Sequence, residues 1–362
     1  MKILSAVLAS ALAASAASAQ VPALMVVDSG ADRVMLFSKV DGSLIDANWI
    51  TDADAVGWVF TTPKEAISVG SEVWVSDQVA DAIHRFDAVT REYVGSITTM
   101  PSGALLDNIR GMGFDGTTVY LTQFHGTTTN RGVVMFATDG TPVGFFPVPT
   151  SSWSWFDVEP FEGDLLISSS STNDVRRYTT DGAPVSVFAP GITFAQQVSR
   201  QADGSIITVA SIAAAGVEGV YHFNADGTLR RFIDTENLKQ HIGEQVPRGA
   251  YQLDDGGYLI ATDRGVYKAV EVSEGFFSFE AMFAGADAQF INPLEIGGTG
   301  CPVDWNGDGD VNSSDISAFL TGWLASLQDS TLDADFNDDL TVNSSDISAF
   351  LTAWLQALTD GC

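Results

Sequence analysis

The sequence predicts a mainly β protein of two domains, a large one built from six small antiparallel sheets and a small helical one that follows it. Before residue 296 the chain is rich in Val, Ile, Phe and Tyr, and a pattern of short strands and turns recurs six times. Almost no helical periodicity interrupts these repeats. After a short Gly-rich segment the composition changes to Asp, Asn, Ser and helix-spaced apolar residues, which indicates a second domain.

The repeated unit is an apolar strand, a polar turn, a second strand and often a third strand. Copies follow one another roughly every 40 to 50 residues, a period typical of propeller blades. The clearer copies span 24–37, 73–86 and 165–178, and the looser ones span 119–136, 205–223 and 258–267. Since one unit cannot bury both of its faces, we expect the units to stack into a six-bladed β-propeller; a seven-bladed ring and a β-sandwich are the alternatives.

The turns and the ends of this domain agree with a closed ring. Asp139-Gly140, Asp181-Gly182 and Asp226-Gly227 stand at the same place in three copies and are strong hairpin signals. Residues 62–69 precede the second copy as its innermost strand, whereas nothing equivalent precedes the first copy and residues 291–296 follow the sixth. We therefore expect the last strand to complete the first blade. The pattern resembles NHL-type and related six-bladed propellers over residues 20–296, which implies a fold and no particular reaction.

The N-terminus has the features of a signal peptide. Met1-Lys2 is positively charged, Ile3 to Ala17 is small or apolar, and Ala17-Ser18-Ala19 offers a cleavage site before Gln20. We expect residues 1–19 to be removed and the protein to be secreted and extracellular. The alternative, a membrane anchor, requires a longer apolar segment, and no later segment is long enough to span a membrane.

The charge is strongly negative and unevenly distributed. The chain has 46 acidic and 17 basic residues, a net charge of −29, which disfavours binding to nucleic acids and to anionic membranes. Residues 301–362 contain eleven Asp and no Glu, Lys or Arg, so this segment carries −11 of the −29. We infer that bound cations form part of its fold.

The only two cysteines, Cys301 and Cys362, stand at the two ends of this acidic segment, after the linker at 297–300. In an oxidising compartment we expect them to form a disulfide; two free thiols are the alternative. Closing a loop of this length stabilises a domain by roughly 4 kcal/mol on the chain-entropy model.

Residues 304–315, D-W-N-G-D-G-D-V-N-S-S-D, have the pattern of a calcium-binding loop. Such a loop places oxygen ligands at positions 1, 3, 5, 7, 9 and 12 and a Gly at position 6, where the backbone turns sharply. Every position is filled, with Gly309 at the turn. The predicted ligands are Asp304, Asn306, Asp308, Asp310 (through its backbone carbonyl), Asn312 and Asp315.

A second loop of the same pattern, D-F-N-D-D-L-T-V-N-S-S-D, spans residues 335–346. Leu340 occupies its turn position, where a positive φ costs a branched residue about 1 kcal/mol or more. We therefore expect two Ca²⁺ sites, of which the second is the weaker. The predicted ligands of the second are Asp335, Asn337, Asp339, Thr341 (through its backbone carbonyl), Asn343 and Asp346.

Each loop runs directly into an amphipathic helix, because residues 311–321 recur identically at 342–352 with helix-spaced apolar residues. This half-EF-hand, repeated twice, resembles the type I dockerin module over residues 301–362. The resemblance implies a calcium-dependent partner of the cohesin type; a tail that anchors the protein to an extracellular matrix is the alternative. The residues that the resemblance assigns to the partner surface are Ser313, Ser314, Phe319, Leu320, Ser344, Ser345, Phe350 and Leu351.

Few residues of the propeller are candidates for chemistry. None of the four histidines (His84, His125, His222 and His241) has metal-ligand spacing, and we interpret them as surface or packing residues. Propellers generally bind ligands where the innermost strands begin, at the mouth of the central channel. The repeat places Glu65, Arg110, Asp157, Arg248 and Glu295 there, with Trp153 and Trp155 at the rim. Such a ring could hold a metal, a carbohydrate such as a sugar acid, or a peptide; ordinary solvated charges and packing aromatics are the alternative.

Two functions remain open from the sequence. The first is a binding or scaffold protein that the calcium-binding tail docks to a partner or anchors to the matrix. The second is a propeller enzyme of extracellular polysaccharide catabolism, a lyase, lactonase or hydrolase, because dockerins usually accompany carbohydrate-degrading enzymes. The lack of a recognisable catalytic motif favours the first.

Overall fold

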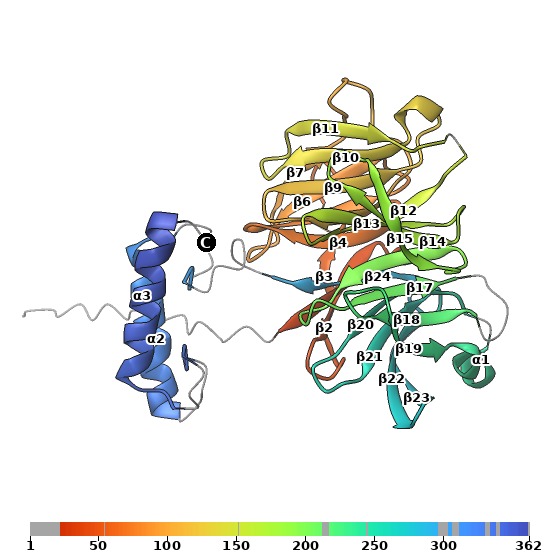
Figure 1. Cartoon of the computed structure of the whole chain (residues 1–362). Helices are drawn as coiled ribbons and strands as arrows, with labels where there is room; N and C mark the ends of the chain where they lie inside the picture. Colours follow the sequence, from red (N-terminus) through yellow and green to blue (C-terminus); the bar gives the residue numbers. More distant parts are fainter. Residues whose placement is uncertain are drawn as a thin grey trace, which may run out of the picture.

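The structure is a computed structural model that describes residues 22–53, 55–150, 152–211, 217–243, 245–295, 303–305, 311–329, 334–337 and 341–360. Within these residues the large domain consists of six four-stranded antiparallel sheets, drawn as a ring of blades in Figure 1. The six-bladed propeller is therefore confirmed, against the seven-bladed ring and the β-sandwich.

The blades follow one another along the chain, and the innermost strand comes first in every blade but the first, whose innermost strand is the last of the propeller. The first contains β24 (Ala288–Leu294), β1 (Ala23–Asp28), β2 (Arg33–Ser38) and β3 (Leu44–Thr51), and the second contains β4 (Pro63–Val69), β5 (Glu72–Asp77), β6 (Ala82–Asp87) and β7 (Tyr93–Ile97). The third contains β8 (Ile109–Phe114), β9 (Thr118–Gln123), β10 (Gly132–Ala137) and β11 (Pro142–Pro147), and the fourth contains β12 (Trp155–Phe161), β13 (Asp164–Ser169), β14 (Asp174–Thr179) and β15 (Pro184–Pro190). The fifth contains β16 (Ala195–Arg200), β17 (Ile206–Ala210), β18 (Gly219–Phe223) and β19 (Leu229–Asp234), and the sixth contains β20 (Pro247–Gln252), β21 (Tyr258–Thr262), β22 (Gly265–Ser273) and β23 (Phe276–Ala284).

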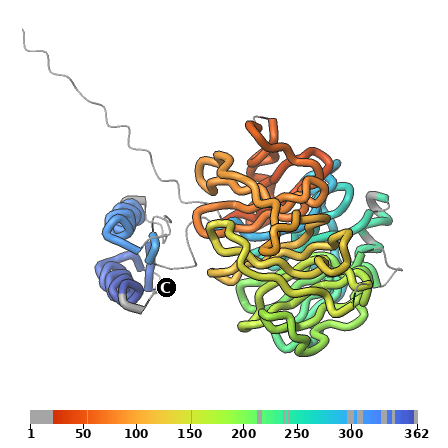
Figure 2. Tube along the Cα trace, turned by 90° about the horizontal axis from the view of Figure 1, so that it is seen from above, coloured from red at the N-terminus to blue at the C-terminus, as the bar shows by residue number. Residues whose placement is uncertain are grey.

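The last strand closes the ring, as predicted. β24 pairs antiparallel with β1, so that Leu294 lies opposite Ala23 and Ile291 opposite Val26. The first blade, in red, and the sixth, in cyan, consequently lie side by side in Figure 2. The predicted hairpin turns are also present, since Gly140, Gly182 and Gly227 all have positive φ values.

Each pair of neighbouring blades encloses its own hydrophobic core. Between the third and fourth blades, for example, Trp155 is fully buried and its ring lies 5.1 Å from that of Tyr178. Because every blade buries apolar side chains on both faces, its strands contain long apolar runs without strict alternation. This packing explains the six strand-rich repeats of the sequence.

A shared irregularity lies near the start of the inner strands. The pairing of each inner strand with its neighbour shifts in register there, for instance between Pro63 and Glu65 in β4 and between Pro247 and Gly249 in β20. The same shift occurs in β8, β12, β16 and β24. Such a bulge re-aims side chains and commonly accompanies functional sites.

The C-terminal tail contains two equal helices, α2 (Ser313–Asp329) and α3 (Ser344–Asp360). Phe319 and Phe350, which are equivalent in the two repeats, stack at 4.1 Å with parallel rings at the centre of the tail's core. The indole of Trp323 donates to the carbonyl of Asn343 at 2.8 Å, and that of Trp354 donates to the carbonyl of Asn312 at 3.0 Å. Each repeat therefore supports the loop end of the other, and the duplication in the sequence becomes a twofold arrangement.

Several predictions concern residues outside the described ones: the signal peptide at 1–19, the linker at 297–300, the disulfide between Cys301 and Cys362, and the middle of both calcium loops. Of the helices in the described part of the chain, none has the length and apolar character needed to cross a membrane.

Candidate functional site

The second residues of the six inner strands surround one end of the central channel. They are Lys64, Arg110, Phe156, Gln196, Arg248 and Gln289. Three of the six are cations and none is an acid, which is unusual in a chain of net charge −29. We call this end, where the inner strands begin, the cationic mouth.

Lys64 is the most enclosed cation of the cationic mouth. Only 5% of its surface is exposed, and its Nζ donates to Oε1 of Gln289 at 2.6 Å. The ammonium also lies 5.1 Å from the ring centroids of both Phe156 and Phe290. Burial, followed by the charges of Arg248 and Arg110, lowers the pKa of Lys64 to about 7.

The two arginines belong to other blades than this lysine: Lys64 is in the second blade, Arg110 in the third and Arg248 in the sixth. Arg110 is 8% exposed, donates to Oγ of Ser154 at 2.7 Å and to the carbonyl of Trp155 at 3.1 Å, and lies 4.4 Å from the ring of Phe156. Burial lowers the pKa of Arg110 to about 10. Arg248 is more accessible and pairs with Asp287 at 3.0 Å.

The third residues of the inner strands fill the channel below this mouth. Oε1 of Glu65 accepts from the side chain of Asn292 at 2.7 Å, and Oε2 accepts from the backbone N–H of Met112. Asp157 accepts from the backbone N–H of Val198 at 2.8 Å. Burial raises the pKa of Glu65 to about 8 and that of Asp157 well above its usual range. These carboxyl groups join neighbouring blades across the channel.

Glycines in the third and sixth blades leave room for side chains of the neighbouring blades. A Cβ on Gly111 would lie 2.0 Å from Oδ1 of Asp157, and one on Gly249 would lie 2.4 Å from Oε1 of Gln197. Gln197 uses this space to reach Ile291, donating to its carbonyl at 2.6 Å and accepting from its N–H at 3.1 Å. The interior of the channel is therefore a tightly packed polar plug.

The opposite end of the channel, where the inner strands finish, opens into a cavity of about 340 Å³. We call it the acidic mouth after Glu159 and Glu295, which line it together with Tyr251 and the cations Lys39 and Arg200. Burial, followed by the charge of Glu65, raises the pKa of Glu159 to about 8. The chain leaves the propeller on this side, since β24 ends at Leu294.

Replacing Glu159 by Gln should reduce the pH dependence of the propeller's stability. The folded protein keeps the Glu159 proton up to a pKa of about 8, whereas the unfolded chain releases it near 4.5, so the free energy of unfolding falls as the pH rises between these values. Between pH 6 and pH 9 the wild type should lose on the order of 2 kcal/mol more than Glu159→Gln. Urea unfolding at both pH values measures the difference; equal losses would contradict the raised pKa.

The structure places the five residues predicted for the mouth at three levels of the channel. Arg110 and Arg248 lie at the cationic mouth. Glu65 and Asp157 lie deeper, because the bulges turn two consecutive residues of each strand toward the channel and the acids are the second of each pair. Glu295 lies at the acidic mouth, since it follows the end of β24 and not its beginning.

Lys64 and Gln289 were missed, although Lys64 directly precedes the predicted Glu65 and the proline before it indicates an irregular strand start. The rim tryptophans are not free to bind a ligand. Trp155 is buried between blades, and Arg176 covers Trp153, with its guanidinium carbon 4.8 Å from the ring centroid.

His84 and His222 are buried packing residues, whereas His125 is partly exposed and accepts from the backbone N–H of Thr127 at 2.9 Å. His222 is buried between the hydroxyls of Tyr258 and Ser205, at 2.8 and 2.7 Å, and burial lowers its pKa to about 4. His84 is buried as well and contacts Oγ of Ser96 at 2.8 Å.

The tail brings together parts of each predicted calcium loop. Asp315 and Asp346, the last predicted ligands, are fully buried, and each accepts from the backbone N–H three residues earlier, Asn312 at 2.9 Å and Asn343 at 2.8 Å. This is a capping-box contact at the start of a helix. The second oxygen of Asp346 accepts from the N–H of Asn337 at 3.3 Å, so the end of this loop meets its beginning.

The other predicted ligands are only partly within the described residues. Asp304, Asp335 and Thr341 are described, whereas Asn306, Asp308, Asp310 and Asp339, together with Leu340, lie outside them. Among the described residues no three His, Cys, Asp or Glu side chains are grouped to hold a metal.

The predicted partner-binding residues divide by burial. Phe319 and Phe350 are fully buried against each other, so a partner cannot reach them while the tail is folded. Leu351 is partly buried in the same core. The surface-exposed members of this set are Ser313, Ser314, Leu320, Ser344 and Ser345.

Comparison with protein-family models and with curated proteins gives no match. Among solved structures, the chain is similar to a protein of unknown function from Bacteroides caccae, at 13% identity and a TM-score of 0.50, over 76% of this chain and 99% of that one. It is also similar to a streptogramin B lyase (12% identity, TM-score 0.49, 72% and 79% covered) and to virginiamycin B lyase from Staphylococcus aureus (15%, 0.46, 71% and 80%). The shared feature is the propeller fold.

Proposed function

We propose that this chain is a secreted binding protein, in which the propeller holds a ligand at a channel mouth and a calcium-loaded, dockerin-like tail attaches it to a partner or to the extracellular matrix. The burial of Asp315 and Asp346 carries this proposal. A buried carboxylate requires compensating positive charge, and residues 301–362 contain no Lys, Arg or His to supply it.

The donor set of the tail fits calcium. Carboxylate, amide and backbone carbonyl oxygens at alternate loop positions are the ligands that Ca²⁺ prefers, and a last ligand at the start of a helix is where such loops end. Asp304, Asn312 and Asp315 would hold the first ion, and Asp335, Asn337, Thr341, Asn343 and Asp346 the second, each with the residues between them in the loop. Bound calcium would neutralise the acidic loops and hold each one against its helix.

An exposed apolar surface on the tail supports docking to a partner. Leu324 and Leu355, equivalent in the two repeats, are 53% and 60% exposed, and the equivalent pair Leu327 and Leu358 is 45% and 50% exposed. Exposed leucines repeated on two helices of one small domain are typical of an interaction surface. The twofold arrangement presents the same surface twice.

Calorimetric titration of the full chain after chelation is expected to detect two calcium ions. Asp346→Asn should leave one ion bound, because Asn removes a charged ligand from the second loop only. Ser348→Ala, in the same helix, serves as the control and should retain both. No measurable heat in the wild type would refute calcium binding.

Docking is tested separately with an immobilised cohesin-type domain and with extracellular matrix from the source. The full chain should be retained on one of them in calcium and released by chelator, whereas Leu324→Ser/Leu355→Ser should lose at least tenfold in affinity with both calcium ions still bound. Equal retention of the double variant would exclude this leucine surface.

A further inference from the structure

Two buried cations of the cationic mouth lack the partner that buried charges normally have. Lys64 donates to the neutral Gln289, and Arg110 donates to the neutral Ser154 and to a carbonyl. Neither forms an ion pair with any carboxylate in the part of the chain that the structure describes. The Nε of Arg110 has no hydrogen-bond partner at all among these residues. An uncompensated buried charge strongly destabilises a fold, so folding stability alone does not explain why these two cations are buried here.

The acids nearest to the cationic mouth do not neutralise it. Burial raises the pKa of Glu65 to about 8 and that of Asp157 well above its usual range, which favours the neutral form of both carboxyl groups. Their oxygens are also directed to the backbone N–H groups of Met112 and Val198 in the next blades. Asp287 pairs with Arg248 at the rim, 3.0 Å away. No described carboxylate therefore forms an ion pair with Lys64 or Arg110, and an entering anion would favour the charged form of Lys64, whose pKa burial lowers to about 7.

We propose that the cationic mouth binds the carboxylate of a small acidic ligand, a sugar acid or another organic acid, with Lys64 and Arg110 as the charged donors and Arg248 at the rim. The inference deepens the proposed function, since it assumes that the propeller is a binding domain. It names the chemistry of the ligand and the mouth that receives it.

The shape of the mouth favours a carboxylate over a bulkier anion. The ring centroids of Phe156 and Phe290 lie 6.5 Å apart, and the ammonium of Lys64 lies 5.1 Å from each of them. The guanidinium of Arg110 lies 4.4 Å from the ring centroid of Phe156. A planar carboxylate matches a planar guanidinium such as that of Arg110 and needs less room than a tetrahedral phosphate. Because Lys64 and Arg110 are less than a tenth exposed, only a terminal group of the ligand can enter.

The cationic mouth lies at the opposite end of the channel from the end of β24. The inner strands begin at the cationic mouth and finish at the acidic mouth, where β24 ends at Leu294. The ligand would therefore bind on the face of the propeller opposite to the end of β24.

Isothermal titration of the full chain in calcium, with D-glucuronate, acetate, D-glucose and inorganic phosphate as probes, tests the proposal. Glucuronate should bind and the uncharged glucose should not. Binding of acetate at similar affinity would identify the carboxylate alone as the ligand, and its failure would identify a sugar acid; both results support the site. Phosphate binding as tight as that of glucuronate would overturn the carboxylate assignment, and no binding of either carboxylate would overturn the site.

Lys64→Met provides the sharper test, because it separates binding from folding. Removing one charge-assisted partner should weaken glucuronate binding at least tenfold. Removing an unpaired buried charge should also raise the melting temperature of the ligand-free protein by about 2 °C or more. A lower melting temperature with unchanged binding would show that Lys64 is a structural residue and would refute its role.

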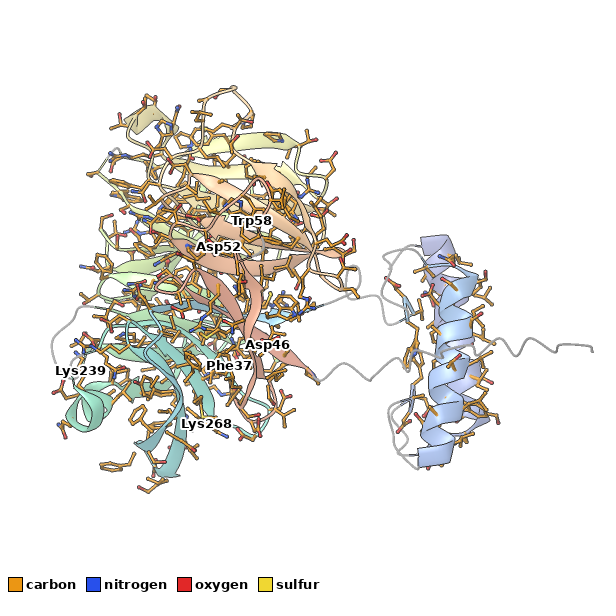
Figure 3. The ribbon with its side chains drawn as sticks, turned by 180° about the vertical axis from the view of Figure 1, so that it is seen from behind. Phe37, Asp46, Asp52, Trp58, Lys239 and Lys268 are labelled. Atoms are coloured by element: carbon orange, nitrogen blue, oxygen red, sulfur yellow. The ribbon has the colours of Figure 1, made fainter. Side chains whose placement is uncertain are left out.

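Two further variants test whether the effect is specific to the cationic mouth. Lys268→Met removes a lysine of β22 that pairs with Asp255 on the periphery (Figure 3), and it should leave glucuronate binding within twofold of the wild type. Arg248→Met replaces the more accessible rim cation and should weaken binding even if Lys64→Met fails to fold; unchanged binding in this variant would count against the site. The titration is repeated in chelator, where unchanged glucuronate binding with no calcium bound separates this site from the calcium sites of the tail.

Discussion

Replacing both Asp315 and Asp346 by Asn should unfold the tail and leave the propeller folded. Both carboxylates are fully buried where the loops enter α2 and α3, and the change removes a charged calcium ligand from each loop. A ligand present at 1,000 times its dissociation constant stabilises a fold by about 4 kcal/mol, a large share of the stability of a domain this small. The helical circular-dichroism signal of α2 and α3 should disappear, and a protease should cleave the tail at 37 °C.

The control is Asp329→Asn, which removes one carboxylate charge by the same substitution at the last residue of α2. An aspartate at a helix C-terminus is unfavourable, so this variant should keep the wild-type helical signal. A folded, protease-resistant tail in the double variant would contradict the role given to Asp315 and Asp346.

Gly111→Ala should destabilise the propeller more than any other single-methyl change in the channel. The added Cβ would lie 2.0 Å from Oδ1 of Asp157 and 2.7 Å from its backbone Cα, so the neighbouring inner strand would have to move. Overpacking of this kind costs about 3 kcal/mol. Urea unfolding followed by tryptophan fluorescence should show the loss, with the tail saturated with calcium so that it does not contribute.

Gly95→Ala is the matched control for this experiment, because Gly95 lies in β7 and no atom would come within 4 Å of the new Cβ. We expect its stability to remain within about 0.5 kcal/mol of the wild type. If Gly111→Ala were equally neutral, the close approach of β8 and β12 at this level would be wrong.

The architecture of the propeller was predictable because each blade repeats a local signal. Strand, turn and strand patterns marked the six blades, and the missing inner strand of the first copy indicated that residues 291–296 return to it. Both signals lie within a single blade or at the ends of the domain. They need no knowledge of how blades face one another.

The channel was only partly predictable, because its lining depends on bulges. Strict alternation in β4 would direct either Lys64 or Glu65 to the channel, whereas the register shift after Pro63 brings both there at different depths. Arg110 and Arg248 were identified by their place in the repeat, but their relation to Lys64 and Gln289 arises only when the six inner strands meet. Glu295 lies at the opposite end of the channel because it follows the end of β24, whereas the other four residues stand near the start of their strands.

The structure of the tail was also predictable only where the local sequence pattern determines it. Helical spacing predicted that Ile316, Phe319 and their equivalents share an apolar face, and the cores agree with it. It could not predict that Phe319 and Phe350 stack on each other and are closed to a partner, while Leu324 and Leu355 remain exposed. That distinction depends on how the two repeats pack.

Hydrogen exchange of the backbone amides of α2 and α3 in the full chain, measured in calcium and in chelator, tests the central claim most directly. Calcium should protect the amides of both helices strongly, and chelation should abolish that protection while the amides of the propeller strands keep theirs. Equal protection of α2 and α3 with and without calcium would contradict a tail organised around bound ions.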